Sequence, residues 1–508
     1  MDVDLLIENA TIVDGYWPTP YLGSVAISGE TIEIVSSCRQ SLNAKKVIDA
    51  KGKHLIPGII DIHSHSDLVR VSEEQFIHKI AMGITTEVIG NCGIGPFPAL
   101  QEGALGSLNY DVLGSRRQFA SFDEYKQAFL KAPPSTNIVA LQAHAPLRIE
   151  VMKERVHQKA TKEEIKQMVT LLETSFEQGV RGFSSGLYYD PCLYADREEL
   201  LALLSVVKKH NGIFSVHHRE EGDGVIESIQ EVIELATHAN VSLQISHLKA
   251  IGEVNQSKVP HMLSLIEEAH EGGLDISFDQ YPYEWGATSL SSLLPPYVLS
   301  MPNEKRTLLL QSKEGREEIR KAIETTNHYD SIIHLCGFDN ITLLSYDADP
   351  SIEGMTLSEI ARMRNVDNWD AFFTLILNNS NSSLMSDITQ SRASIEMIMA
   401  HPLGFFSTDA IYSGRHFHRR STHAVQDLFD NYYIKKEVLS IAEHVKRMSV
   451  NPAKKLGLLD RGMIMTGYKG DLLLIDLKEK AHVDMVIVNG KIAYEDDTLR
   501  GDYTALVL

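Results

Sequence analysis

Cysteine is scarce in this chain, with four residues among 508, and the four lie far apart at Cys38, Cys92, Cys192 and Cys336. This spacing predicts no disulfide framework of the kind that stabilises small secreted proteins. The start of the chain, MDVDLLIENATIVDG, lacks a basic segment followed by an apolar stretch and a cleavage site, and no later segment reaches about 18 uncharged apolar residues. We therefore expect a cytoplasmic protein that is neither secreted nor membrane-spanning.

Basic residues are also in the minority, because 48 Lys and Arg stand against 68 Asp and Glu and give a net charge of −20. An acidic chain of this kind disfavours nucleic acid or an anionic membrane surface as the main partner. We expect a small-molecule partner and leave the formation of a homo-oligomer open. With 43% hydrophobic residues the chain can bury a large core, but it is too long for one simple unit.

The two ends of the chain share one texture, short β segments broken by Gly, Asn and Asp turns. They read DLLIENATIVDG, VAISGETIEIV and KVIDAKGKHLIPG at the start, and YKGDLLLIDL and VDMVIVNGKIAYED at the end. This pattern predicts one small β-sandwich domain built from residues 1–56 and 451–508. The long region between them, 57–450, is expected to form the main domain.

Short apolar runs alternate with amphipathic helices along that region, and eight of the runs read as strands. The first is PGIIDIHSH (57–65), and the other seven are GITTEVIGNCG (83–93), NIVALQAHAP (137–146), GVRGFSSGLYY (179–189), GIFSVHHRE (212–220), VSLQISHLKA (241–250), LDISFDQYPY (274–283) and PLGFFSTDA (402–410). Eight β/α units predict an α/β fold, a (β/α)₈ TIM-like barrel, in which catalytic residues lie at the carboxyl ends of the strands.

One stretch, from about 295 to 365, does not fit a single β/α loop. It carries a charged amphipathic helix, SKEGREEIRKAIE, with Ser312 as its expected N-cap, and the apolar run SIIHLCGF (331–338), which we interpret as a further strand. The stretch is predicted to be an inserted subdomain, and an insertion at the mouth of a barrel is a natural lid.

The predicted strand ends carry metal-binding side chains. His63 and His65 stand at i and i+2, so on an extended chain they point to the same side and can grip one cation. Cys92, one histidine of the His217-His218 pair and His247 supply three zinc ligands and leave a fourth position for water. The plain alternatives are a buried apolar cysteine and histidines that only cap strands. Because cysteine and histidine recur at the ends of several predicted strands, we favour metal binding over these alternatives.

The last predicted strand ends in Ser-Thr-Asp, where Asp409 can take a proton from a water and pass it to a leaving amine. On its own such a tripeptide is more often a helix N-cap or a turn. Its place beside the metal-binding strand ends favours the catalytic interpretation, which is hydrolysis assisted by a metal.

With these residues in these positions, the chain resembles the amidohydrolase superfamily and, within it, the N-acyl-D-amino-acid deacylases, or D-aminoacylases. The motifs that carry the resemblance run nearly end to end: PGIIDIHSHSD, GITTEVIGNCGIG, GFSSGLYYDP, HHREEGD, ISHLKA, DQYPYEWGATSLSSLLPP, STDA, HFHRR and NPAKKLGLLDRGMIMTGYKGDLLLID. The resemblance implies zinc-dependent hydrolysis of N-acyl-D-amino acids, with release of a carboxylate and a free D-amino acid.

The resemblance also implies roles for individual residues. A tight zinc would use Cys92, His217 and His247, and a weaker second site would use His63 and His65, with Cys92 as a candidate bridge. Asp409 would be the general acid and base, and His218 would have no ligand role. The substrate carboxylate or amide would be held by Arg420, Lys249, Tyr283, Tyr189 and Ser289. The family's His-Pro-Arg is replaced here by His418-Arg419-Arg420. Without the proline, the resemblance does not fix the backbone conformation of this segment.

Two alternatives remain beside this interpretation. A cyclic-amide hydrolase, similar to a hydantoinase or dihydroorotase, is expected to have a metal-bridging lysine at the end of the fourth strand, and GFSSGLYYD contains none. A non-catalytic binding protein with the same fold would have lost its metal ligands, and all of them are present. The leucines in SLSSLLPPYVL weakly favour an apolar D-amino acid over D-glutamate or D-aspartate, although Lys249 and Arg419 could serve an acidic side chain instead.

Overall fold

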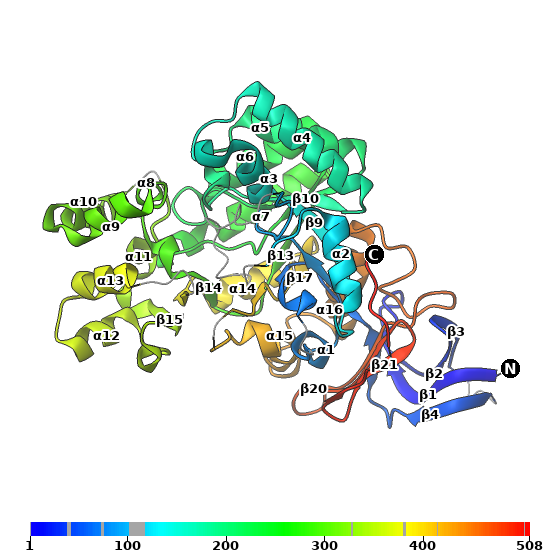
Figure 1. Ribbon diagram of the computed structural model, residues 1–508. Helices are drawn as coiled ribbons and strands as arrows, with labels where there is room; N and C mark the ends of the chain where they lie inside the picture. Colours follow the sequence, from blue (N-terminus) through cyan, green and yellow to red (C-terminus); the bar gives the residue numbers. More distant parts are fainter. Residues whose placement is uncertain are drawn as a thin grey trace.

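The computed structural model describes residues 2–37, 42–72, 76–100, 117–326, 329–378, 383–413, 415–501 and 503–508. Every site residue predicted above lies within these ranges, whereas Cys38 lies outside them. Three parts can be followed in Figure 1: a central barrel with its helices, a sheet built from the first and the last strands of the chain, and a group of helices and strands on the opposite side of the barrel.

The central sheet has eight parallel strands in the order β17-β13-β12-β11-β10-β9-β8-β6. Their bounds are β6 Ile59–Asp61, β8 Ile84–Ile89, β9 Asn137–Ala143, β10 Gly182–Gly186, β11 Ile213–His217, β12 Ser242–Ile245, β13 Ile276–Gln280 and β17 Gly404–Phe406. Each of the eight predicted runs contains one of these strands. The predicted α/β fold class, a TIM-like barrel, is therefore confirmed.

The first and last strands of this sheet meet through short contacts that nearly close the barrel. Strand β7 (Ser64–His65) pairs in parallel with β18 (Ala410–Ile411). In addition, the Thr408 amide donates to the carboxylate of Asp61 at 2.9 Å, and the Asp409 amide donates to the carbonyl oxygen of His63 at 2.9 Å. These contacts bring the segment after β17 beside the segment after β6.

Helices cover the barrel, and they follow the strands in the expected alternation. Their bounds are α1 His78–Ala81, α2 Phe122–Lys131, α3 His144–Met152, α4 Lys162–Glu177, α5 Arg197–Lys209, α6 Val225–Ala239, α7 Val259–Glu271, α14 Arg392–Ala400, α15 Arg420–Phe429, α16 Ile441–Val445 and α17 Asn451–Lys455. Helix α4 begins with a capping box between Thr161 and Glu164. Its side chains at helical spacing, Ile165, Met168, Leu172 and Phe176, are buried in the barrel core.

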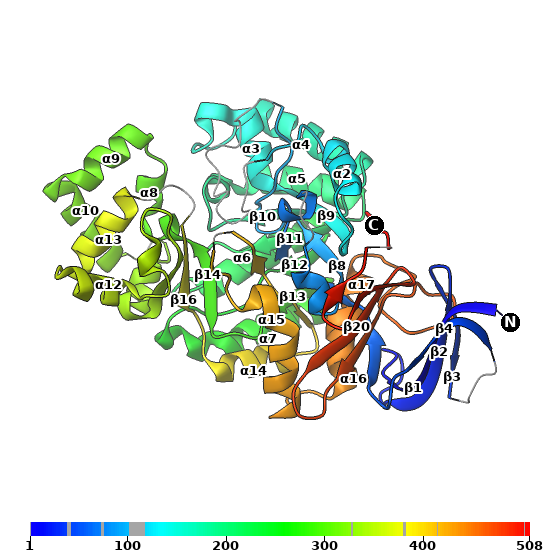
Figure 2. The ribbon, with the colours of Figure 1, turned by 60° about the horizontal axis from the view of Figure 1, so that its bottom comes forward.

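A nine-stranded sheet joins the two ends of the chain (Figure 2). Its strands are β1 Asp2–Ile12, β2 Tyr21–Ser28, β3 Thr31–Ser36, β4 Asn43–Asp49, β5 His54–Pro57, β19 Leu472–Asp476, β20 His482–Val488, β21 Lys491–Glu495 and β22 Thr498–Leu499. Antiparallel pairing of β5 with β19 links the amino-terminal and carboxy-terminal strands. Asn489 and Gly490 both have positive φ, 48° and 78°, as the tight turn between β20 and β21 requires. The domain limits 1–56, 57–450 and 451–508 stay a prediction.

The inserted part has its own sheet and its own core. Strands β14 (Trp285–Ser289), β16 (Leu384–Ile388) and β15 (Ile341–Ser345) pair antiparallel in that order. The helices are α8 Pro296–Leu299, α9 Asn303–Gln311, α10 Lys313–Glu324, α11 Ile332–Cys336, α12 Leu357–Arg364 and α13 Asn368–Leu377. We call residues 285–388 the inserted unit, and it is longer than the 295–365 expected, because its two flanking strands pair with each other.

One predicted element of this unit is wrong. SIIHLCGF was expected to be a strand, but Ile332–Cys336 forms helix α11, with the Ser331 hydroxyl accepting from the His334 amide as its N-cap. A short apolar run fits either element by its pattern alone, and the capping serine decides it. The other prediction holds, because Ser312 caps α10 by accepting from the Gly315 amide. None of the described helices combines the length and the apolar composition of a membrane span.

Candidate metal centre and active site

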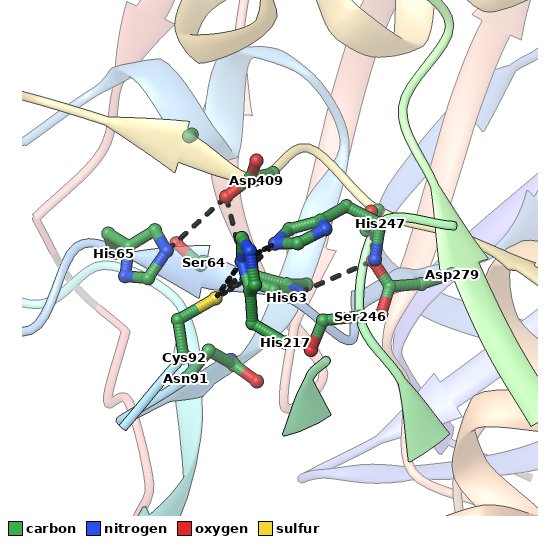
Figure 3. A network of polar contacts seen from close by, with 12 residues as sticks. His63, Ser64, His65, Asn91, Cys92, His217, Ser246, His247, Asp279 and Asp409 are labelled. Atoms are coloured by element: carbon green, nitrogen blue, oxygen red, sulfur yellow. Dashed lines mark hydrogen bonds and ion pairs between the residues drawn. The ribbon is translucent and has the colours of Figure 1, made fainter. Parts of the chain in front are cut away.

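Residues from five strand ends meet at one point of the barrel mouth (Figure 3). His63 and His65 follow β6, Cys92 follows β8, His217 ends β11, His247 follows β12 and Asp409 follows β17. All six side chains are buried. The structure thus brings together every predicted metal ligand and the predicted acid and base.

The ligand atoms of Cys92, His217 and His247 are grouped closely enough to share one ion. The Cys92 Sγ lies 4.0 Å from His217 Nδ1 and 3.5 Å from His247 Nε2, and these two nitrogens are 2.9 Å apart. Tetrahedral zinc, at about 2.0 Å from nitrogen and about 2.3 Å from sulfur, separates its ligand atoms by roughly 3.3 to 3.6 Å. The three side chains therefore fit a zinc ion with small adjustments.

A second group of donors adjoins the first. His63 Nε2 lies 3.3 Å from the Cys92 Sγ and 3.5 Å from Asp409 Oδ1, and His65 Nε2 lies 3.3 Å from the same oxygen. His63, His65 and Asp409 can therefore surround a second cation, and the Cys92 sulfur lies between the two groups. This arrangement fits the predicted second site on His63 and His65.

Three of these residues have an unusual backbone. Cys92, His247 and Asp409 adopt φ values of 53°, 36° and 47°, in the left-handed region that favours glycine. Such a conformation costs about 1 to 3 kcal/mol per residue and persists where the surrounding structure holds it. Its occurrence at three strand ends that meet at one point indicates that the position of these side chains is functional.

Two carboxylates that the sequence analysis missed support the histidines from behind. Glu221 lies with Oε1 3.1 Å from His247 Nδ1 and with Oε2 3.6 Å from His217 Nε2. Asp279 lies 3.3 Å from His63 Nδ1 and accepts the His247 amide at 3.0 Å. Carboxylates in this place fix the tautomer and the orientation of metal-binding histidines.

The predicted exclusion of His218 agrees with its position. Its Nδ1 lies 3.1 Å from the Ser228 hydroxyl, on the side of β11 that faces helix α6. Burial lowers its pKa to about 3, so it is a neutral side chain in the packing between strand and helix.

The charges of the cluster suit a cation. Burial works against ionisation of the Cys92 thiol, but His63 and His247 outweigh it and hold the pKa well below its ordinary value. Burial likewise opposes ionisation of Asp409, and the charges of Arg420 and His63 bring its pKa well below the usual range. A thiolate and an ionised carboxylate are the forms that bind metal.

A cavity of about 50 Å³ adjoins the cluster and is lined by residues of the barrel and of the inserted unit. Among the predicted substrate-binding residues, Arg420, Lys249 and Tyr189 line it. Tyr283 and Ser289 do not: the Tyr283 hydroxyl donates to Asp427 at 2.6 Å, and Ser289 bonds with Ser291. The cavity wall has Tyr281 and Thr288 instead.

Tyr281 could have been found from its register with Asp279. It stands two residues after Asp279, whose side chain faces the metal-binding histidines, so on an extended chain Tyr281 points to the same side. Tyr283 comes after Pro282, and its ring packs at 5.3 Å from that of His418, beyond the cavity wall.

The two basic side chains in the cavity wall, Arg420 and Lys249, form ion pairs within the protein. Arg420, 1% exposed, lies with Nη1 2.8 Å from Asp409 Oδ2, and its Nη2 donates to the Ala287 carbonyl at 3.1 Å. Its Nε has no hydrogen-bond partner among the described residues. Lys249 donates to Glu221 Oε1 at 2.6 Å. Both side chains are held in place where a substrate anion could reach them.

A larger cleft of about 1120 Å³ lies next to this cavity, and the two share Tyr188 and Tyr189 in their walls. Its apolar lining includes Leu193, Leu294 and Leu299. Of the leucines expected to favour an apolar side chain, Leu290 and Leu293 pack in the core of the inserted unit and do not line the cleft, whereas Leu294 packs in that core and also lines the cleft. The small cavity and the larger cleft together could hold a substrate much longer than the cavity alone.

Comparisons with known proteins agree with this architecture. Two models of the amidohydrolase family match the chain, at residues 46–289 and 306–493. An N-acyl-D-glutamate deacylase of Alcaligenes xylosoxydans xylosoxydans is 27% identical over 474 residues, which cover 93% of this chain and 87% of that protein.

Two solved structures are similar over almost the whole chain. An N-acyl-D-glutamate deacylase from Bordetella bronchiseptica, complexed with zinc and a phosphonate inhibitor, has a TM-score of 0.85 at 24% identity and covers 100% of both chains. A D-aminoacylase described by the role of its binuclear metal centre has a TM-score of 0.83 at 26% identity and covers 99% of both chains.

Proposed function

The chain belongs to the amidohydrolase family, and on that premise we propose that it hydrolyses the amide bond of N-acyl-D-amino acids, releasing a carboxylate and a free D-amino acid. Relatives that match nearly its full length include an N-acyl-D-glutamate deacylase and a D-aminoacylase. The observation that carries the proposal is that Cys92, His217 and His247 meet Asp409 beside a cavity. The wall of this cavity has two basic side chains, Lys249 and Arg420.

We propose that Cys92, His217 and His247 hold one tightly bound zinc ion, and that His63 and His65 contribute to a weaker second site. When bound, zinc acts as a Lewis acid that makes water a better nucleophile and polarises the amide carbonyl. Glu221 and Asp279 orient the histidine rings, so that a metal-facing nitrogen is free in each.

Asp409 is assigned the proton transfers. It lies at the mouth of the barrel with Oδ1 within 3.3 to 3.5 Å of the two histidines after β6. An ionised carboxylate at this place accepts the proton of the attacking water and delivers it to the departing nitrogen. Without that delivery the amine would leave as an unstable anion.

The α-carboxylate of the substrate is assigned to Arg420 and Lys249, with Tyr281 as a hydrogen-bond donor beside them. Arginine suits a carboxylate because its planar fork donates two parallel hydrogen bonds. Tyr189 lies between the small cavity and the larger cleft, which leads us to assign the acyl group to the cleft. Tyr283 and Ser289 lie outside the cavity wall, so we transfer their expected roles to Tyr281 and Thr288.

The cyclic-amide alternative is less well supported. Strand β10, the fourth of the barrel, has the sequence GFSSG and supplies no lysine to bridge two metals. The donor that lies between the two groups of ligands is the Cys92 sulfur.

A direct test is a panel of N-acetyl-D-amino acids and N-acetyl-L-amino acids, with detection of the free amine by ninhydrin. We expect release from the D-enantiomers and not from the L-enantiomers. Amides and esters of the same compounds should not be hydrolysed, because they lack the anion that Arg420 binds. A preference for the L-enantiomer would reject the proposed function.

A further inference from the structure

One carboxylate in the wall of the catalytic cavity has no assigned role. Asp387, on strand β16 of the inserted unit, is 3% exposed and lines the cavity with Lys249 and Arg420. Within the described ranges of the chain no other residue forms a hydrogen bond or an ion pair with its carboxylate, and only its own backbone amide acts as a donor. A buried carboxylate normally has partners, because leaving it without them is costly.

The space in front of this carboxylate is kept open by a glycine. A methyl group built on Gly286, the residue opposite Asp387 in the β14–β16 pairing, would lie 3.1 Å from the methyl group of Thr389, 3.2 Å from Asp387 Oδ1 and 3.5 Å from the Tyr281 hydroxyl. The two oxygens therefore face the same small space, which we call the Gly286 niche. A group of the substrate that enters this niche meets a carboxylate acceptor on one side and a hydroxyl on the other.

The charges around the niche favour a hydrogen-bond donor. Lys249 is paired with Glu221 at 2.6 Å, and Arg420 is paired with Asp409 at 2.8 Å. Asp387 is thus an additional negative charge that neither cation neutralises by contact. Burial raises its pKa to about 6 although Lys249 opposes the shift, so at pH 8 it is ionised.

The proposed function decides which part of the substrate faces the niche. The scissile amide must lie at the metal ligands and Asp409, and the α-carboxylate lies at Arg420 and Lys249. The acyl group continues into the larger cleft past Tyr189. The remaining substituent of the α-carbon is the side chain, and the remaining wall of the cavity is the one formed by the inserted unit.

Resting on the proposed function, we propose that Asp387 is a specificity-determining residue, which accepts a hydrogen bond from the side chain of the D-amino acid and rejects side chains that carry a carboxylate. Side chains with an amide or hydroxyl donor, such as that of D-glutamine, would be preferred over the acids of the same shape. An N-acyl-D-glutamate deacylase and a D-aminoacylase are almost equally similar to this chain, at 27% and 26% identity.

The test compares N-acetyl-D-glutamine with N-acetyl-D-glutamate, which differ in charge and hardly in shape, at pH 8 with the zinc-loaded protein. We expect kcat/KM for the amide to exceed that for the acid by about 100-fold, because like charges in a buried site repel strongly. Asp387→Asn keeps the shape and removes the charge, so the ratio should fall by at least about tenfold. Asp339→Asn, the same change on the exposed surface of the inserted unit, should leave the ratio as it is.

N-acetyl-D-leucine serves as the reference substrate in each assay. If it is hydrolysed while N-acetyl-D-glutamate equals or exceeds N-acetyl-D-glutamine, or while Asp387→Asn keeps the wild-type ratio, Asp387 does not determine specificity. If none of the three is hydrolysed, the proposed function itself fails, and the role of Asp387 fails with it.

A second variant covers a failure of Asp387→Asn to fold. Gly286→Ala places a methyl group in the niche and keeps the charge of the Asp387 carboxylate. It should raise KM for N-acetyl-D-glutamine by more than for N-acetyl-D-alanine, whose side chain does not reach the niche. An equal change in KM for both substrates would reject the niche as the place of the side chain.

Discussion

Glu221 offers the sharpest test of how the metal centre is built. Its carboxylate lies 3.6 Å from His217 Nε2 and 3.1 Å from His247 Nδ1, the ring nitrogens that face away from Cys92, and it pairs with Lys249 at 2.6 Å. Glu221→Gln keeps the size of the side chain and removes its charge. We expect weaker zinc binding and a less stable fold, without loss of any residue that touches the metal.

The two effects have different sizes. Loss of a carboxylate behind a metal-binding histidine weakens metal affinity by about 10- to 100-fold, or about 1.4 to 2.7 kcal/mol. The ammonium of Lys249, 5% exposed, keeps no carboxylate partner in the described part of the chain once Glu221 is neutral. Removing the charge of one partner of a buried ion pair lowers the free energy of unfolding by about 3 to 5 kcal/mol.

Zinc affinity is measured by competition with a chelator, and stability by urea unfolding of the metal-free protein. Glu220→Gln is the matched control, because Glu220 is the preceding residue but lines the larger cleft and touches no metal-binding histidine. An unchanged zinc affinity in Glu221→Gln, or an equal loss in Glu220→Gln, would refute the orienting role of Glu221.

Three further predictions concern Asp409, Arg420 and Asp330. Asp409→Asn should lower kcat by about 10²- to 10⁴-fold while elemental analysis finds zinc still bound. A decrease in kcat of less than about tenfold would exclude Asp409 as the proton carrier. Arg420→Ala should raise KM by the equivalent of about 2 to 5 kcal/mol, whereas Arg419→Ala, whose guanidinium binds Asp427, should change KM little; similar effects of both would reject the assignment. Burial raises the pKa of Asp330 from 3.8 to about 7, so between pH 4 and 7 the folded chain keeps a proton there that the unfolded chain releases, and the stability of the wild type falls as the pH rises through that window. The stability of Asp330→Asn relative to the wild type should therefore grow over that pH window in urea unfolding, and a constant difference would contradict the buried ionisation.

The barrel and the meeting of the candidate metal ligands could be predicted because both depend on local patterns. An apolar run of a few residues that ends in Gly-Asn-Cys-Gly or in Ser-Thr-Asp indicates a buried strand and a polar end at once. Cys92 and Asp409 could therefore be found without knowledge of the packing. In an eight-stranded barrel the carboxyl ends of all strands meet, so the topology alone brings these residues together.

The parts that could not be predicted depend on contacts across the fold. Glu221 and Asp279 support the histidines through distances set by neighbouring strands. The choice between Tyr281 and Tyr283 depends on where the extended chain ends, because β13 stops at Gln280 and Pro282 lies in a bend. Helix α11 resembles a strand in sequence because two adjacent isoleucines fit both periods. Asp387 comes from a strand more than 100 residues after the Gly286 it faces, and no local signal marks it.

The most direct test of the account is to remove zinc with a chelator and to titrate it back while hydrolysis of N-acetyl-D-leucine is followed. The wild-type protein should lose its activity and regain it at about one zinc per chain, the number that the Cys92, His217 and His247 site can hold, and Cys92→Ala should neither retain zinc nor recover. Full activity without metal, or full zinc retention in Cys92→Ala, would contradict the account.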